Sequence, residues 1–131
     1  MKQFLLKYSL VNAIGWTVLI FILCSTPGQY IPTTNWLELL SFDKFVHASI
    51  FYVLITLWLI HYKKQSNYSR TCIIIIVIMA ISYGGLLEIM QAKLFSHRSG
   101  DWLDFTANTF GCLVGVYLFE KIISNKLSNK I

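Results

Sequence analysis

Apolar residues run in four long stretches along this chain, and short polar segments separate them. The apolar stretches cover about residues 5–24, 43–62, 71–91 and 104–123. An α-helix needs about 20 apolar residues to cross the ~30 Å hydrocarbon core of a bilayer, and each stretch reaches that length. The pattern therefore predicts an all-α integral membrane protein, a four-helix bundle that forms a single domain over residues 1–131.

Composition supports a membrane protein over a soluble domain. Hydrophobic residues make up 56% of the 131 residues and charged residues only 13%, which is more apolar than soluble domains usually are. The net charge of +5 does not indicate nucleic-acid binding, because the basic residues lie in short loops and tails between apolar stretches. The three cysteines lack metal-ligand spacing, so we expect buried thiols and no metal site.

Lysine and arginine residues are distributed unevenly between the two ends of the predicted helices. Eight lie before or at the start of the first stretch, between the second and third, or at the end of and after the fourth. Lys44, Lys93 and Arg98 lie at the other end. Basic residues concentrate on the cytoplasmic side of membrane proteins. We therefore expect a multi-pass protein with both termini in the cytoplasm.

Polar residues gather at the opposite, outer end of three stretches. They are Asp43, Lys44, His47, Glu88, Gln91, Arg98, Asp101, Asp104 and Asn108. Residues three or four apart share one face of a helix, and these spacings recur within each group. With a rise of ~1.5 Å per residue, His47, Glu88 and Asn108 fall in one layer just below the surface. Ionisable groups at that depth usually serve a function, so we expect the nine residues to form a ligand-binding site.

The same residues also have a purely structural interpretation. Polar side chains often hold membrane helices together, and Asp101 and Asp104 suit the first turn of a helix. Gly111 and Gly115 lie four residues apart on the face that carries Asp104. This small-residue spacing predicts close helix packing inside the bundle rather than a chemical role.

The order of the polar residues resembles that of the VanZ-like family of small bacterial membrane proteins. The resemblance rests on Asp43-Lys44-x-x-His47, Glu88-x-x-Gln91, Arg98-Ser99-x-Asp101-x-x-Asp104, Asn108-Thr109-x-Gly111 and Ser25-x-Pro27-Gly28. It implies a four-helix bundle in the bacterial cytoplasmic membrane and a link to low-level resistance to the glycopeptide teicoplanin. Many relatives have Pro-Gly before the arginine, whereas this chain has Ser96-His97.

Two classes of function fit this pattern. In the first, which we favour, the outer cluster binds a lipid head group or a cell-wall precursor, with Lys44 and Arg98 meeting phosphate or carboxylate. In the second, the chain is a membrane enzyme with His47, Glu88 and Asp104 as candidate catalytic acid–base groups. The sequence offers no activated nucleophile and no paired histidines for a metal, and we expect no cofactor. Membrane lipids are the expected partners, and four short spans leave little room for a transporter site.

Overall fold

All regular secondary structure in the described part of this chain is helical. A computed structural model describes residues 1–25, 36–66, 68–93 and 102–123, with backbone only for residues 2, 36–43 and 123. The elements are α1 (Lys2–Lys7), α2 (Ser9–Cys24), α3 (Trp36–Lys64), α4 (Arg70–Lys93), α5 (Trp102–Leu118) and a π-helical turn, η2 (Phe119–Ile123). The prediction of an all-α chain is confirmed.

The connection between α3 and α4 shows how local residues set helix ends. Ser66 adopts a φ of 61°, a left-handed conformation that stops a right-handed helix. Ser69 then starts α4, because its Oγ accepts a hydrogen bond from the backbone N–H of Cys72 at 3.1 Å. A serine in this position satisfies one of the N–H groups that have no partner inside the helix.

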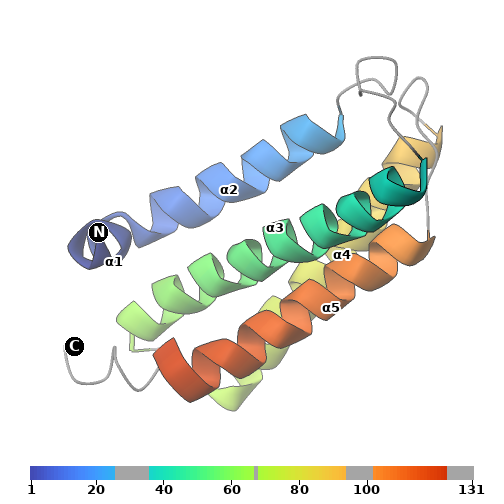
Figure 1. Cartoon of the computed structure of the whole chain (residues 1–131). Helices are drawn as coiled ribbons and strands as arrows, with labels where there is room; N and C mark the ends of the chain where they lie inside the picture. The colour runs from blue at the N-terminus through green and yellow to red at the C-terminus, as the bar shows by residue number, and fades with distance from the viewer. Residues whose placement is uncertain (26–35, 67, 94–101, 124–131) are drawn as a thin grey trace.

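The first predicted helix is broken, which corrects the expectation of one continuous span over 5–24. The backbone leaves the helical conformation at Tyr8, with φ −110° and ψ 31°, and α1 runs in a different direction from α2 (Figure 1). The Ser9 Oγ, one residue later, lies 3.1 Å from the His61 Nδ1 near the end of α3. This contact fixes the start of α2 beside α3.

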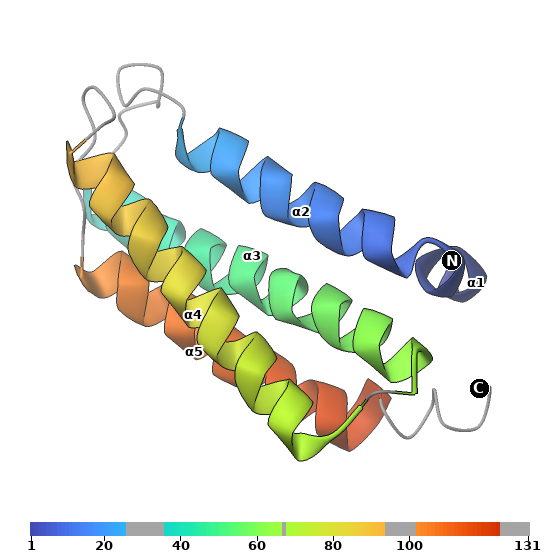
Figure 2. The same ribbon diagram turned by 180° about the vertical axis from the view of Figure 1, so that it is seen from behind.

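Helix α3 lies at the centre of the fold, with α2, α4 and α5 around it (Figures 1 and 2). It supplies much of the buried apolar core, including Phe51, Leu54, Ile55 and Leu59. Because α2 and α4 run opposite to α3, one end of the fold collects the start of α3, the start of α5 and the ends of α2 and α4. Of the polar residues singled out in the sequence, those with described side chains belong to that end: Lys44, His47, Glu88, Gln91, Asp104 and Asn108.

Two glycines bring α5 against the backbone of α3. A Cβ added to Gly111 would lie only 2.9 Å from the carbonyl carbon of Ala48, and one added to Gly115 would overlap the Ile55 side chain. Only glycine allows two helices to approach this closely. The predicted role of Gly111 and Gly115 in close packing within the fold is confirmed.

The outward faces of the helices are apolar. Val11 of α2 is 67% exposed, and Met79 of α4 is 68% exposed. Soluble proteins rarely expose long apolar faces. Two helical segments, Lys44–Lys64 within α3 and Arg70–Lys93, are long and apolar enough to cross a membrane, whereas Ser9–Cys24 is apolar but shorter.

Candidate functional site at one end of the helices

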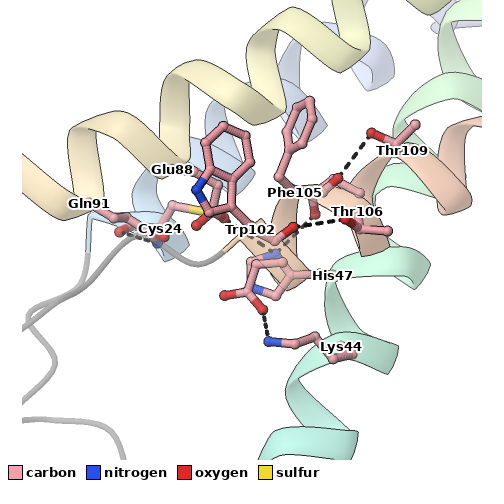
Figure 3. Close-up of polar contacts among 11 residues, drawn as sticks. Cys24, Lys44, His47, Glu88, Gln91, Trp102, Phe105, Thr106 and Thr109 are labelled. Atoms are coloured by element: carbon pink, nitrogen blue, oxygen red, sulfur yellow. Dashed lines mark hydrogen bonds and ion pairs between the residues drawn. The ribbon is translucent and has the colours of Figure 1, made fainter.

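Polar side chains from three helices meet at the end of the fold described above (Figure 3). His47 comes from α3, Glu88 from α4, and Asp104 and Asn108 from α5. Each of these four side chains belongs to a residue that is more than nine-tenths buried. We call these four residues, together with Lys44, the polar cluster. The sequence predicted that they converge, and the structure brings them together.

His47 is the centre of the polar cluster. Its Nδ1 lies 3.0 Å from the Asn108 Oδ1. Because an amide oxygen can only accept, this hydrogen bond requires the proton on Nδ1. The other ring nitrogen, Nε2, lies 3.7 Å from the Asp104 Oδ2, and the Glu88 Oε1 is 4.0 Å from Nδ1. The imidazole therefore lies between two carboxylates, with its orientation set by Asn108.

Lys44 forms an ion pair with the Oδ1 of Asp104, at the rim of the polar cluster. The Lys44 side chain is 22% exposed, whereas that of Asp104 is 10% exposed. Asp104 also lies in the first turn of α5, where the helix dipole favours a negative charge. The pair thus stabilises a buried carboxylate and leaves a cation at the edge of the cluster.

Gly84 makes room for this arrangement one turn below Glu88. A Cβ at residue 84 would lie 3.2 Å from the Asn108 Nδ2 and 3.1 Å from the Phe51 ring. These separations are tighter than ordinary van der Waals contact, so a larger residue would push Asn108 away from His47.

Gln91 has a different role from the rest of the predicted site. Its Nε2 donates to the backbone carbonyl of Cys24 at 3.1 Å, as Figure 3 shows. The bond satisfies a carbonyl at the C-terminal end of α2, which has no partner within the helix. Gln91 is therefore an anchor between α2 and α4. The side chain of Asp43, and the residues Arg98 and Asp101, lie outside the described part of the structure.

The sequence did not point to a metal site, yet three metal-ligand side chains lie together here. His47, Glu88 and Asp104 each offer one ligand atom, and these atoms lie within 4.8 Å of one another. They come from three different helices, so no spacing along the chain marks them as a set. The order of the helices around α3 brings them together.

A second buried histidine lies at the opposite end of the fold, and sequence reasoning missed its surroundings. The two ring nitrogens of His61 contact the Ser9 Oγ and the Gln65 Nε2, both at 3.1 Å. Gln65 lies one turn after His61, a spacing that the sequence shows, but Ser9 is 52 residues away. The Ser9 contact joins α2 to α3, and the two contacts together satisfy a buried imidazole.

An apolar cavity of about 310 Å³ lies among α2, α3 and α4, away from the polar cluster. Its lining includes Thr17, Trp58, Met79 and Tyr83. Two polar groups at its edge are hydrogen-bonded: the Tyr83 hydroxyl donates to the Thr17 carbonyl and the Trp58 Nε1–H to the Thr17 Oγ1. The lining of the cavity is mainly apolar.

Comparison with protein-family models, with curated proteins and with solved structures found no match to this chain. The polar cluster is the part of the described structure with the richest chemistry. In the described residues that chemistry consists of two carboxylates, one ammonium group, one imidazole and one amide, nearly all of them buried.

Proposed function

We propose that this chain is a VanZ-like protein of the bacterial cytoplasmic membrane, whose polar cluster binds an anionic group of a cell-envelope ligand at the outer surface. The ligand is a lipid head group or a cell-wall precursor. The observation that carries the proposal is the convergence of His47, Glu88, Asp104 and Asn108, from three helices, on one buried site. Helix packing alone needs far fewer ionisable groups at this depth.

The proposal includes a topology in which four helices cross the membrane and both termini are cytoplasmic. Eight of the eleven basic residues then lie on the cytoplasmic side, as the positive-inside rule requires. The polar cluster, at the other end of the helices, faces the envelope. A site that faces outward suits a cell-wall or lipid ligand, and it fits the link to teicoplanin resistance that the family resemblance implies.

Lys44 and Arg98 have the chemistry to recognise the anion. The Lys44 ammonium lies at the exposed rim of the polar cluster, next to Asp104. Arg98 belongs to the segment that leads into α5, and a guanidinium can donate two parallel hydrogen bonds to a phosphate or carboxylate. Asp104 holds the Lys44 ammonium in place, and the ligand contributes the opposing charge.

The test is lipid binding by the full-length protein in non-ionic detergent, measured by native mass spectrometry. The probes are phosphatidylglycerol, phosphatidylcholine and a lipid-linked cell-wall precursor. We expect the anionic probes to bind preferentially, and both Lys44→Met and Arg98→Lys to weaken that binding by about tenfold, the equivalent of ~1.4 kcal/mol. Lys64→Met, at the other end of α3, is the matched control and should bind like the wild type. Equal binding by all variants would mean that the cluster is purely structural.

A second candidate function is an enzyme that acts on the same head group. The observation in its favour is the position of His47 between Glu88 and Asp104, at 4.0 Å and 3.7 Å. A histidine held between carboxylates can serve as a general base or acid. In that case the mass of the bound lipid changes during incubation, and His47→Gln stops the change but keeps the lipid bound. An unchanged lipid mass with the wild type counts against an enzyme.

A further inference from the structure

We infer that His47, Glu88 and Asp104 bind one divalent transition-metal cation. The three side chains are of the types that bind such ions, they come from α3, α4 and α5, and their ligand atoms lie within 4.8 Å of one another. All three residues are 7% exposed, so a bound ion would be shielded from bulk water. Metal binding at these three side chains does not require the proposed envelope ligand.

The hydrogen bond from His47 to Asn108 orients the imidazole as a metal ligand. The Nδ1 proton is donated to the Asn108 Oδ1 at 3.0 Å. Histidines that bind metals usually donate their second ring N–H to a carbonyl or carboxylate in this way, which fixes the tautomer. The lone pair of the neutral ring is then on Nε2, the nitrogen that faces Asp104.

The spacing between Nε2 and Asp104 fits a metal ion better than a proton. The Nε2 and the Asp104 Oδ2 are 3.7 Å apart. A shared proton would draw them to the ~2.7–2.9 Å of a charge-assisted hydrogen bond. A cation bound at ~2.0–2.2 Å from each would hold them ~3–4 Å apart. Glu88, whose Oε1 lies 4.0 Å from Nδ1, would turn toward Nε2 to supply a third ligand.

Lys44 does not compete with the cation for Asp104. The ammonium contacts the Oδ1 of Asp104, whereas the Oδ2 is the oxygen that faces His47. One carboxylate can therefore bind the metal through one oxygen and Lys44 through the other. Lys44 then positions the Asp104 ligand, much as outer partners do in other metal sites.

The ligand set indicates the class of metal. One imidazole with two carboxylates suits Mn²⁺, Fe²⁺ or Zn²⁺, whereas Mg²⁺ and Ca²⁺ prefer all-oxygen sites. Three protein ligands leave at least one coordination position open, as in catalytic rather than structural zinc sites. Should the proposed function hold, that position would take an oxygen of the anionic ligand.

The experiment measures binding of Mn²⁺ or Zn²⁺ alone to the full-length protein in non-ionic detergent after treatment with a chelator. Free Mn²⁺ is followed by electron paramagnetic resonance, and bound metal is counted by mass spectrometry. We expect one cation per chain, and at least a tenfold loss of affinity in Glu88→Gln and Asp104→Asn, which keep the side-chain size. Glu120→Gln, in η2 at the other end of the fold, is the control and should bind metal like the wild type.

Three outcomes would overturn the inference: no metal bound by the folded wild type, several weak ions per chain, or equal binding by the two ligand variants and the control. Circular dichroism on each sample shows whether the helices are intact. The titration of the wild type tests metal binding even if a variant fails to fold. Because the probe is metal without lipid, failure here leaves the lipid-binding result unaffected, and failure of lipid binding leaves the metal result unaffected.

Discussion

Among single residues, the approach of the buried polar groups to one another could be predicted from the sequence. Helical rise placed His47, Glu88 and Asn108 in one layer, and the structure brings His47 to 3.0 Å from Asn108 and 4.0 Å from Glu88. Asp104 was expected one turn nearer the surface, yet its Oδ2 also faces His47. Helical rise gives depth within one helix, but it does not give the shift between two neighbouring helices.

The partner of His61 could not be predicted in the same way. His61 and Gln65 lie one turn apart, but the hydroxyl of Ser9 reaches His61 from a helix that begins 52 residues earlier. A lone serine in an apolar stretch carries no signal of its partner. Such long-range contacts depend on how α2 docks on α3, which the pattern of apolar residues leaves open.

Tyr68, outside the proposed spans, leads to a prediction about pH. Its hydroxyl donates a hydrogen bond to the Glu120 carboxylate. The Tyr68 pKa is raised above its usual value of 10.0, mainly because the phenol is buried and also because of this hydrogen bond. The fold therefore favours the neutral phenol, so its contribution to stability is complete below pH ~10 and is lost as the pH rises further. As the pH is raised from ~9 to ~12, we expect the melting temperature of Tyr68→Phe to fall less than that of the wild type.

Circular dichroism melting curves in non-ionic detergent across this pH range would measure the effect. Tyr117→Phe is the matched control, because Tyr117 is 61% exposed on α5. The wild type and the control should show the same alkaline loss of stability. Identical curves for Tyr68→Phe and the wild type would argue against the Tyr68–Glu120 contact.

For whole helices, the sequence predicted where the long apolar segments lie better than where they begin and end. The structure breaks the first segment at Tyr8 and extends α3 back to Trp36, seven residues before the predicted start at Asp43. Neither position carries a proline or glycine signal that would mark it. By contrast, the spacing of Gly111 and Gly115 correctly predicted a closely packed face, although not that α3 would be the partner.

Two glycine-to-alanine substitutions should have opposite effects on stability. Gly111→Ala places a Cβ against the backbone of Ala48, so we expect a loss of ~1–3 kcal/mol from overpacking. Gly15→Ala, on α2, meets nothing within 4 Å, and we expect a gain of up to ~1 kcal/mol because alanine favours the helix. Unfolding in mixed micelles, followed by circular dichroism, would give both free energies. A neutral Gly111→Ala would show that α3 and α5 are farther apart than described.

Over the whole molecule, the sequence established an all-helical, strongly apolar chain but not the arrangement of its helices. Helix α3 is central because α2, α4 and α5 all pack against it. The sequence of any one helix does not predict this arrangement. The apolar outward faces agree with the predicted membrane location, and two helical segments meet the length and hydropathy needed to cross a bilayer.

The proposed topology predicts which residues reagents can reach from outside the cell. In a variant without the native cysteines, a cysteine at Ser99, between α4 and α5, should react with a membrane-impermeant thiol reagent in intact cells. A cysteine at Ser66, between α3 and α4, should react only after the cells are opened. Each site is the other's control. Labelling at Ser66 but not at Ser99 in intact cells would reverse the orientation and put the polar cluster on the cytoplasmic side.

Gly111 and Gly115 of α5 differ in how readily evolution can replace them with a larger residue. Position 111 faces the main chain of Ala48, which no substitution at residue 48 can remove, so this position is closed to any larger side chain while α3 and α5 keep their spacing. Position 115 mainly faces the side chain of Ile55, which can shrink. A homologue can therefore replace Gly115 once residue 55 has become smaller. Replacing Gly111 requires α3 and α5 to move apart.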